Sequence, residues 1–372
     1  MTRTTELLSR DPSDRIQVLD ADGNVVTPEL VPDLDDETFI AMYRDMQFCR
    51  RFDERIISLQ RQGRLGTYSS LAGQEGAQIG STYALADEDL ISYQYREHGA
   101  VVARGFPWEY LLYWAGDEHG NAALAEKNIL PLNITIGDHL PHVVGMAWAA
   151  KLQNDDNVTI AHFGDGATSE GDFHEALNFA GVFDVPAVFI CNNNQWAISV
   201  PTERQTASAT FAQKAHAYGF EGVQVDGMDP LAMYAVTDAA RKKAKQPTDG
   251  SLRPTLIEAV QYRFGAHTTA DDPSVYRDPA DVESWRQRDP LSRFESFLCN
   301  TDRLDNDEIS RIDSEIDDSL ANLIDPVEEH DANPDEMFDY TFAEPTDRLL
   351  DQREYLGSLR QTYGDNALLQ DE

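Results

Sequence analysis

Two short polar segments carry residue types that could bind a metal ion and a phosphate group. One is Gly164-Asp165-Gly166 and the other is Asn192-Asn193-Asn194, and each follows a short apolar run. Glycines permit a tight turn and a close approach of the backbone to a ligand. A helix that begins after such a turn presents free N–H groups to an anion. Because carboxylate and amide oxygens suit Mg²⁺, Asp165 and Asn194 are predicted to bind a cation that carries a diphosphate.

These side chains can meet only if two parallel strands end at one edge of a sheet. Strand and helix patterns alternate through the middle of the chain, which favours an α/β fold with a parallel sheet and helices on both faces. The predicted strands are residues 157–163, 185–191, 222–225 and 255–262, and the predicted helices between them are residues 169–183 and 230–245. Since carboxyl ends of parallel strands share an edge, Asn194 is expected near Asp165.

Further helices are predicted on either side of this region from helical spacing of apolar residues. They span residues 36–62, 73–85 and 100–114, with Asp36 as the expected N-cap of the first. We divide the chain into a polar N-terminal arm (1–35), a central domain (36–300) and an acidic, helical C-terminal extension (301–372).

The composition limits the classes of partner. There are 66 acidic and 30 basic residues, giving a net charge of −36, which disfavours nucleic acid and anionic membranes as partners. The acidic residues are dispersed, which favours a solvated surface adapted to high salt. No apolar run reaches the roughly 20 residues of a membrane span, and no secretory signal is visible. Three scattered cysteines indicate a reducing, cytoplasmic setting.

The segment from Gly164 to Ser199, GDGATSEGDFHEALNFAGVFDVPAVFICNNNQWAIS, resembles the thiamine diphosphate motif of the alpha subunits of 2-oxo acid dehydrogenases. The likeness is to the pyruvate and branched-chain members, and it extends from about residue 36 to about residue 300. A plain Asx turn could explain the asparagines alone, but not the whole spaced motif. A P-loop is excluded because residues 164–171 lack the Gly-Lys-Ser/Thr ending.

The resemblance implies a thiamine diphosphate-binding fold and a set of cofactor contacts. Mg²⁺ ligands would be the side chains of Asp165 and Asn194 and the backbone carbonyl of Trp196. Backbone N–H groups of Gly166 and Ala167 would meet the diphosphate.

Two further segments match the family. In Tyr95-Arg96-Glu97-His98-Gly99, Arg96 and Tyr95 would bind the diphosphate, and His98 would be a proton donor. In the segment that begins at Tyr262, Arg263 would add positive charge near the phosphates. His267 would contact the diphosphate or donate protons during acyl transfer. Its downstream part, residues 268–277, occupies a loop phosphorylated in some relatives, but a bland polar loop explains its hydroxyl groups equally well.

The segment Ile134-Thr135-Ile136-Gly137 resembles the family's support for the aminopyrimidine ring. Backbone groups of Ile134 and Ile136 would hydrogen-bond the ring, and the Ile136 side chain would hold the cofactor's bent shape. Asp138 and His139 replace an Ala-Gln pair common in the family. Ser69 stands where some relatives carry a histidine near the substrate.

The function implied is thiamine diphosphate-dependent oxidative decarboxylation of a 2-oxo acid, with acyl transfer to a lipoyl-bearing acyltransferase. The glutamate that activates the coenzyme would lie on a beta subunit in an α₂β₂ heterotetramer, so this chain alone would be inactive. Pyruvate is the favoured substrate. The open alternatives are branched-chain 2-oxo acids, acetoin, and a non-catalytic scaffold of the same fold.

Overall fold

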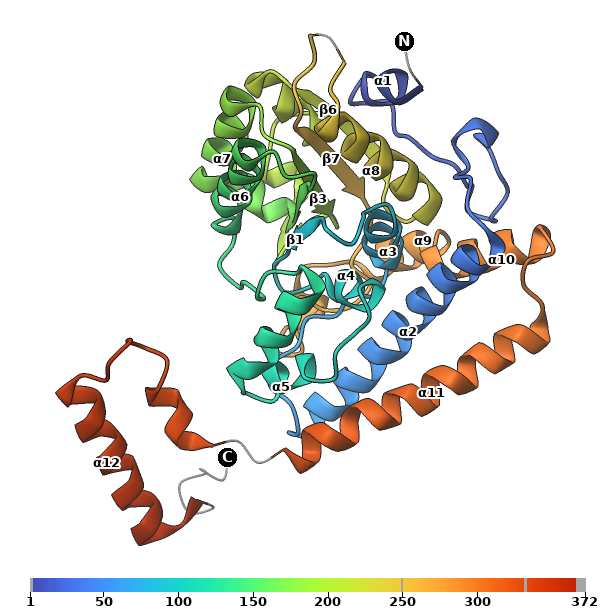
Figure 1. Cartoon of the computed structure of the whole chain (residues 1–372). Helices are drawn as coiled ribbons and strands as arrows, with labels where there is room; N and C mark the ends of the chain where they lie inside the picture. Colours follow the sequence, from blue (N-terminus) through green and yellow to red (C-terminus); the bar gives the residue numbers. More distant parts are fainter. Residues whose placement is uncertain (1–2, 249, 331–332, 366–372) are drawn as a thin grey trace. The chain divides into compact units, whose positions relative to one another are not determined.

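The computed structural model describes residues 3–248, 250–330 and 333–365, and the chain divides into two compact units (Figure 1). The first unit is Met1–Val327 and the second is Glu328–Glu372. Each unit is described by itself below.

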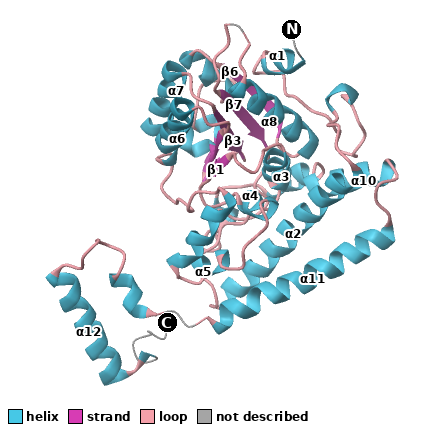
Figure 2. Ribbon diagram, viewed as in Figure 1, coloured by secondary structure: helices cyan, strands magenta, loops and turns pink. Residues whose placement is uncertain are grey.

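A five-stranded parallel sheet forms the centre of the first unit (Figure 2). Its strand order is β1-β2-β3-β7-β6. The strands are β1 (Leu90–Ser92), β2 (Thr159–Gly164), β3 (Ala187–Asn193), β6 (Glu221–Asp226) and β7 (Thr255–Val260). All four neighbouring pairs are parallel, which confirms the predicted sheet and adds β1, a short strand that the sequence did not reveal.

Helices cover both faces of the sheet, as predicted. Alternate strand residues point to opposite faces, and the apolar residues of each face pack against a different set of helices. Ile160 and Ile190 belong to a core shared with α2 (Asp36–Arg61), α3 (Glu75–Tyr83) and α8 (Pro230–Lys245). Ala161, Phe163 and Phe189 belong to a second core shared with α6 (His139–Gln153) and α7 (Gly171–Phe183). The site must therefore lie at an edge of the sheet, since both faces are occupied.

Two local expectations were wrong, and one helix was missed. The single helix predicted over residues 100–114 is two helices, α4 (His98–Ala103) and α5 (Tyr110–Trp114), because Gly105 has φ +78° and Pro107 follows it. The N-cap of α2 is Asp35, whose side chain accepts a hydrogen bond from the Thr38 N–H, and not Asp36. Helix α6 was not predicted.

The remaining elements of the first unit are mostly short. They are α1 (Arg3–Leu8), η1 (Pro28–Leu30), η2 (Glu118–Lys127), η3 (Asp165–Ser169), β4 (Trp196–Ala197), β5 (Val200–Pro201), η4 (Thr202–Arg204), η5 (Ala212–Tyr218), η6 (Pro273–Val275), α9 (Pro279–Arg286), α10 (Pro290–Asn300) and most of α11 (Asn306–Glu329), which continues two residues beyond the first unit.

Both ends of the first unit pack on its main core. In the N-terminal arm, Ile16, Val18 and Leu19 are buried, and the N–H groups of Val18 and Leu19 each donate to Asp229 Oδ2 at 2.7 Å. In α11, Ile312 and Ile316 are buried in the same core. The contacts within the structure thus divide the chain after Val327. The predicted boundaries of the central domain, at residues 36 and 300, remain predictions.

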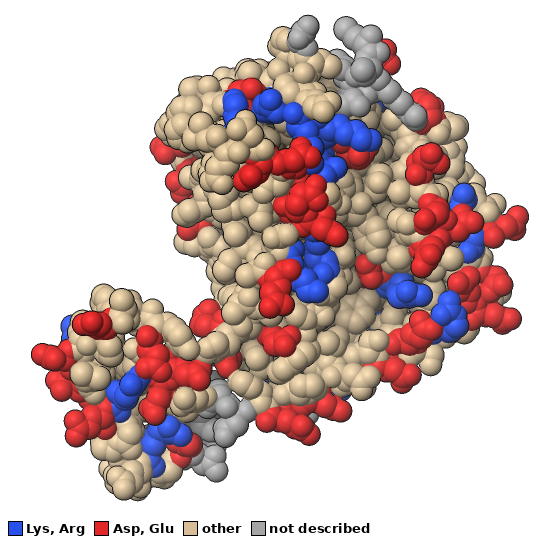
Figure 3. Space-filling view, viewed as in Figure 1, with Lys and Arg blue, Asp and Glu red and all other residues tan. Residues whose placement is uncertain are grey.

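The second unit is helical, with η7 (Pro334–Phe338) and α12 (Asp347–Tyr363). Arg353 in α12 forms an ion pair with Asp339 and lies 5.7 Å from the centre of the Phe338 ring. Within the described residues, no helix is long and apolar enough to cross a bilayer. The acidic side chains in Figure 3 are dispersed over the visible face, and they do not form one patch.

A buried carboxylate in α2 holds residues 68–71, the segment that contacts an arginine of the pocket described below. Asp53 in α2 accepts hydrogen bonds from Tyr68 Oη at 3.0 Å, Ser70 Oγ at 2.5 Å and the Leu71 N–H at 2.9 Å. The carbonyl of Ser70 in turn accepts from Arg96 Nη1 at 2.6 Å. This network ties the long helix to an arginine of the pocket.

Asp53→Ala is therefore expected to lower the free energy of unfolding by about 3 kcal/mol, because three buried donors lose their acceptor. The urea midpoint of the assembled protein would measure the loss. Asp238→Ala serves as the control, since Asp238 makes only an i,i+4 pair with Lys242 in α8, a contact that contributes about 0.5 kcal/mol or less. Equal shifts for both variants would contradict this role of Asp53.

Candidate active site

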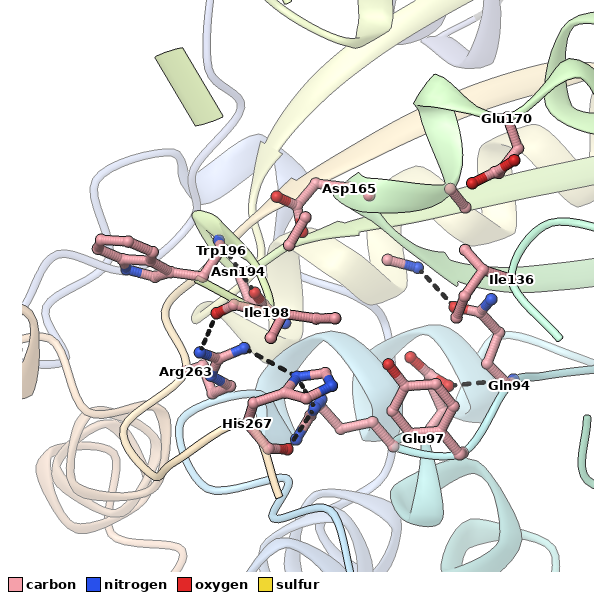
Figure 4. A pocket seen from close by; sticks show the side chains of 16 residues that line it. Gln94, Glu97, Ile136, Asp165, Glu170, Asn194, Trp196, Ile198, Arg263 and His267 are labelled. Carbon is pink, nitrogen blue, oxygen red and sulfur yellow. Dashed lines mark hydrogen bonds between the residues drawn. The ribbon is translucent and has the colours of Figure 1, made fainter. Parts of the chain in front are cut away.

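A pocket opens beside the carboxyl ends of β2 and β3 (Figure 4). Open α/β sheets generally bind ligands at this edge. The pocket is lined by Gln94, Tyr95, Arg96, Glu97, Ile136, Gly164, Asp165, Gly166, Ala167, Glu170, Asn194, Trp196, Ala197, Ile198, Arg263 and His267. It therefore gathers ten of the twelve residues predicted to form the site; Ile134 and His98 are the exceptions.

Asp165 and Asn194 reach the same pocket from neighbouring strands. Gly164 pairs with Asn192 in the parallel register of β2 and β3, so the two chains leave the sheet side by side. Asp165 begins η3 directly after β2, and Asn194 follows β3. The predicted convergence of these two side chains is present in the structure.

The Asp165 carboxylate is almost fully enclosed, with 1% of its surface exposed. Its Oδ2 accepts a hydrogen bond from Gln205 Nε2 at 2.6 Å. Burial raises the pKa of Asp165 to about 6, and the Gln205 hydrogen bond opposes that rise only in part. A carboxylate in this setting favours a nearby cation, because burial disfavours an isolated negative charge.

The amide of Asn194 is held in one orientation. Its Nδ2 donates to Gln74 Oε1 at 3.2 Å, and its Oδ1 accepts from the Trp196 N–H at 3.3 Å. Because Gln74 Oε1 can only accept, it fixes Nδ2 on its own side and leaves Oδ1 towards the pocket. Gln74 is fully buried at the start of α3, and sequence analysis did not assign it this role.

If Asp165 and Asn194 hold Mg²⁺ as the resemblance implies, Gln74→Met should weaken Mg²⁺-dependent cofactor binding about 10-fold, since the amide of Asn194 would lose its orienting acceptor. Titration calorimetry on the assembled protein would measure the change in affinity. Gln224→Met is a matched control, since the buried Gln224 in β6 accepts from Arg15 and does not line the pocket. If both variants lowered the affinity equally, loss of packing would explain the effect.

The helix predicted over residues 169–183 is present as α7, and a short 3₁₀ helix that was not predicted precedes it. Residues Asp165–Ser169 form a 3₁₀ helix, η3, and α7 begins at Gly171. Gly166 lies in η3 beneath the β4–β5 hairpin, where an added Cβ would lie 2.9 Å from the Ala197 Cβ. A glycine is thus required there by the close approach of the hairpin.

Two arginines and a histidine form a cationic cluster on the opposite side of the pocket. Arg96 Nη2 lies 3.2 Å from His267 Nδ1 and donates to the His267 carbonyl at 2.8 Å. Arg263 Nη1 lies 3.2 Å from the same Nδ1, and Arg263 Nη2 donates to the Ile198 carbonyl at 2.8 Å and to Tyr276 Oη at 3.0 Å. These acceptors are all neutral, so the two guanidinium charges suit an anionic ligand.

The contacts also define the protonation of His267. Guanidinium nitrogens only donate, so Nδ1 must accept and the proton of the neutral ring must sit on Nε2. Burial, then Arg96 and Arg263, lower the pKa of His267 to about 4. Burial, followed by Arg96, lowers the pKa of Arg263 to about 10. His267 is therefore a neutral N–H donor at neutral pH while the pocket holds no anion.

Of the other predicted residues, some line the pocket and some lie outside it. Tyr95 and Ile136 line the pocket, and the Tyr95 ring packs edge-on to His267 with centroids 6.1 Å apart. The side chain of Ile134 is 58% exposed and lies outside the lining. Asp138 and His139 are also outside it: Asp138 Oδ1 accepts from Asn133 Nδ2, and His139 is buried against the His162 carbonyl.

His98 does not line the pocket with His267. It is fully buried, its Nδ1 lies 2.8 Å from Tyr110 Oη, and its Nε2 lies 3.0 Å from the Ser69 carbonyl. The ring stacks on Tyr68 at 4.9 Å, and burial lowers its pKa to about 3. Both nitrogens are engaged and the ring stays neutral, so this position supports a structural role and gives no support to the predicted proton donor.

Several lining residues were missed by sequence analysis. Glu97 occupies the variable position of the Tyr-Arg-x-His-Gly segment, and its pKa is raised by burial. Gln94 Oε1 accepts from the Gly164 N–H at 3.1 Å. The position of Glu97 next to Arg96 could have indicated it, whereas Gln205, which follows η4, lies 40 residues from Asp165 and carries no local sequence signal.

Comparisons with known proteins agree with this geometry. The family model described as "Dehydrogenase E1 component" matches residues 43–335. The 3-methyl-2-oxobutanoate dehydrogenase subunit alpha of Mycobacterium tuberculosis is 42% identical over 365 residues, covering 94% of this chain and 97% of that protein.

Pyruvate dehydrogenase E1 component alpha subunits are similar to the same degree. That of Acholeplasma laidlawii is 40% identical over 339 residues, covering 90% of this chain and 97% of its own. That of Staphylococcus aureus is 45% identical over 287 residues, covering 77% of this chain and 76% of its own. The chain therefore belongs to the dehydrogenase E1 component family, as an alpha subunit of the type that its sequence motifs predicted.

Proposed function

We propose that this chain is the alpha subunit of a thiamine diphosphate-dependent 2-oxo acid dehydrogenase that acts on pyruvate. The observation that carries the proposal is the meeting of Asp165, Asn194 and the cationic cluster in one pocket. Membership of the E1 family implies the coenzyme, and the pocket offers oxygen donors and positive charges that suit its diphosphate end.

The donor set fits a Mg²⁺ diphosphate. The carboxylate of Asp165, the amide oxygen of Asn194 and a backbone carbonyl at Trp196 are hard oxygen ligands of the kind Mg²⁺ takes alongside phosphate oxygens. Arg96 and Arg263 would hold the diphosphate through charge-assisted hydrogen bonds, joined by Tyr95 and backbone N–H groups of Gly166 and Ala167. His267 would donate its Nε2 proton.

The chemistry that thiamine diphosphate supplies when bound is nucleophilic attack on the 2-oxo carbon and uptake of the electrons left by CO₂. This chain's residues would bind and orient the ligand and neutralise its charge. His267 would hold a proton on Nε2 during acyl transfer to a lipoyl group. Ile136 would support the bent form of the coenzyme, with Ile134 contributing backbone groups.

Exposed apolar side chains support a second subunit beside the pocket. Ile136 lines it and is nevertheless exposed, and Val200 is also exposed in the adjoining hairpin. On α6 and α7, Trp148 stacks on Phe183 at 4.1 Å and is itself exposed. Exposed apolar groups of this kind mark protein interfaces, and a beta subunit in an α₂β₂ assembly would cover them.

The relatives favour two substrate classes. Two of those described are named for pyruvate and one for 3-methyl-2-oxobutanoate, a branched-chain 2-oxo acid, so a branched-chain dehydrogenase is the second candidate. Acetoin is a third substrate to compare. A lipoyl-bearing acyltransferase would accept the acyl group. A cytoplasmic setting and adaptation to high salt are further parts of the proposal, supported by the dispersed acidic residues.

The test is CO₂ release from pyruvate, branched 2-oxo acids and acetoin by this chain co-expressed with a beta-type subunit. Activity of the pair with Mg²⁺ and thiamine diphosphate, and none from this chain alone, is the expected result. The substrate with the highest kcat/KM would decide between the candidates. Absence of coenzyme binding by the assembled pair in calorimetry would instead indicate a non-catalytic scaffold.

A further inference from the structure

A strained residue lies at the mouth of the pocket. Ile198 has φ +56°, a left-handed conformation that β-branched residues rarely adopt. It is the first of two residues that join β4 to β5, whose register pairs Ala197 with Val200. A two-residue hairpin turn of this kind needs a positive φ at its first position and normally uses glycine, asparagine or aspartate there.

Packing in the hydrophobic core of this chain does not offset the energetic cost of the strained backbone at Ile198. The Ile198 side chain is 57% exposed, so it contributes little to the packing of the first unit. The side chain lines the pocket instead, and Figure 4 shows it extending into the cavity between Asp165 and His267, with Ile136 beyond. Strained residues that the fold does not require are concentrated at functional sites.

The backbone of the same residue holds the cationic cluster. Its carbonyl accepts from Arg263 Nη2 at 2.8 Å, while Arg263 Nη1 lies 3.2 Å from His267 Nδ1. The turn thereby fixes the carbonyl that orients Arg263, and the same turn aims the aliphatic side chain at the ligand space. A less strained residue could keep the first of these contributions but not the second.

We infer that Ile198 is a positioning residue, whose strained turn orients Arg263 and supplies an aliphatic wall against the bound coenzyme. This inference rests on the proposed function, because the ligand is thiamine diphosphate with Mg²⁺. The aliphatic wall stabilises the bound ligand, and the strain destabilises the chain without it. The two effects have opposite signs and can be measured separately.

The experiment compares Ile198→Asn with wild type in the complex with the beta-type subunit. Asparagine tolerates a positive φ, so the thermal midpoint of the coenzyme-free complex should rise by about 2 °C. The dissociation constant of thiamine diphosphate at saturating Mg²⁺ should rise about 10-fold, because an apolar contact is lost. Ile198→Val keeps the strain and most of the wall, so its affinity should fall by less than about threefold.

Asn154→Gly is the matched control, since Asn154 has φ +60° at the end of α6 outside the pocket lining. Its coenzyme affinity should equal that of wild type. Unchanged affinity in Ile198→Asn, or lost affinity together with a lower thermal midpoint, would overturn the inference. If the wild-type complex itself failed to bind the coenzyme, the proposed function would fail first.

Discussion

Asp165→Asn is expected to lower the Mg²⁺-dependent affinity for thiamine diphosphate by at least about 100-fold and to abolish measurable CO₂ release. Loss of a partner that only supports a metal ligand already costs about 10- to 100-fold in affinity, and Asp165 is proposed as a direct ligand. The substitution keeps the volume of the side chain and removes its charge. Calorimetry with Mg²⁺ and coenzyme on the assembled protein is the direct measurement.

The fold should survive this change. Burial raises the pKa of Asp165 to about 6, so the ionised carboxylate destabilises the coenzyme-free chain, and an amide there is expected to leave its thermal midpoint unchanged or higher. Asp172→Asn is the control, because Asp172 lies in the first turn of α7 and not in the pocket lining. Normal coenzyme affinity in Asp165→Asn would refute the proposed metal site.

Arg96→Met should weaken coenzyme binding by roughly 10- to 100-fold, since a hydrogen bond to a charged group contributes about 1.5–3 kcal/mol. The methionine fills much of the stem volume but carries no charge. Arg96→Lys restores the charge without the planar fork, so its affinity should lie between those of methionine and wild type. Dissociation constants for all three proteins would be measured at several salt concentrations.

Salt dependence provides an internal check on the same pair. Salt screens the attraction between a cationic side chain and a diphosphate. The coenzyme affinity of the wild-type protein should therefore fall more steeply with salt concentration than that of Arg96→Met. Arg104→Met is the control, because Arg104 bonds to the carbonyls of Ala86, Asp87 and Asp89 and does not line the pocket. Equal losses in both variants would show that general charge, and not the pocket, controls binding.

The sequence was sufficient for the sheet edge that carries the site. Alternating strand and helix patterns placed β2, β3, β6 and β7 correctly, because each is a short run with β-branched residues between helical segments. Asp165 and Asn194 were found because each directly follows a strand. By contrast β1 has three residues, too few for a periodic pattern, and was missed.

The contacts around the pocket were less accessible to sequence reasoning. His98 was placed in the site by its neighbours in the motif, yet α4 turns its ring into the aromatic cluster of Tyr68 and Tyr110. Gln205 and Gln74 reach Asp165 and Asn194 from distant parts of the chain, so only the tertiary structure reveals them. The strain of Ile198 arises from its positive φ, and an isoleucine in the sequence gives no reason to expect a positive φ.

The strand order has a consequence for how the protein is synthesised. Strand β7 is the last strand of the sheet in the sequence, but it lies between β3 and β6. Until residues 255–260 leave the ribosome, the fully buried strand β3 has no partner on one side. Nascent chains held at this stage expose an apolar edge to other polypeptides, so chaperone demand should peak shortly before residues 255–260 emerge from the ribosome.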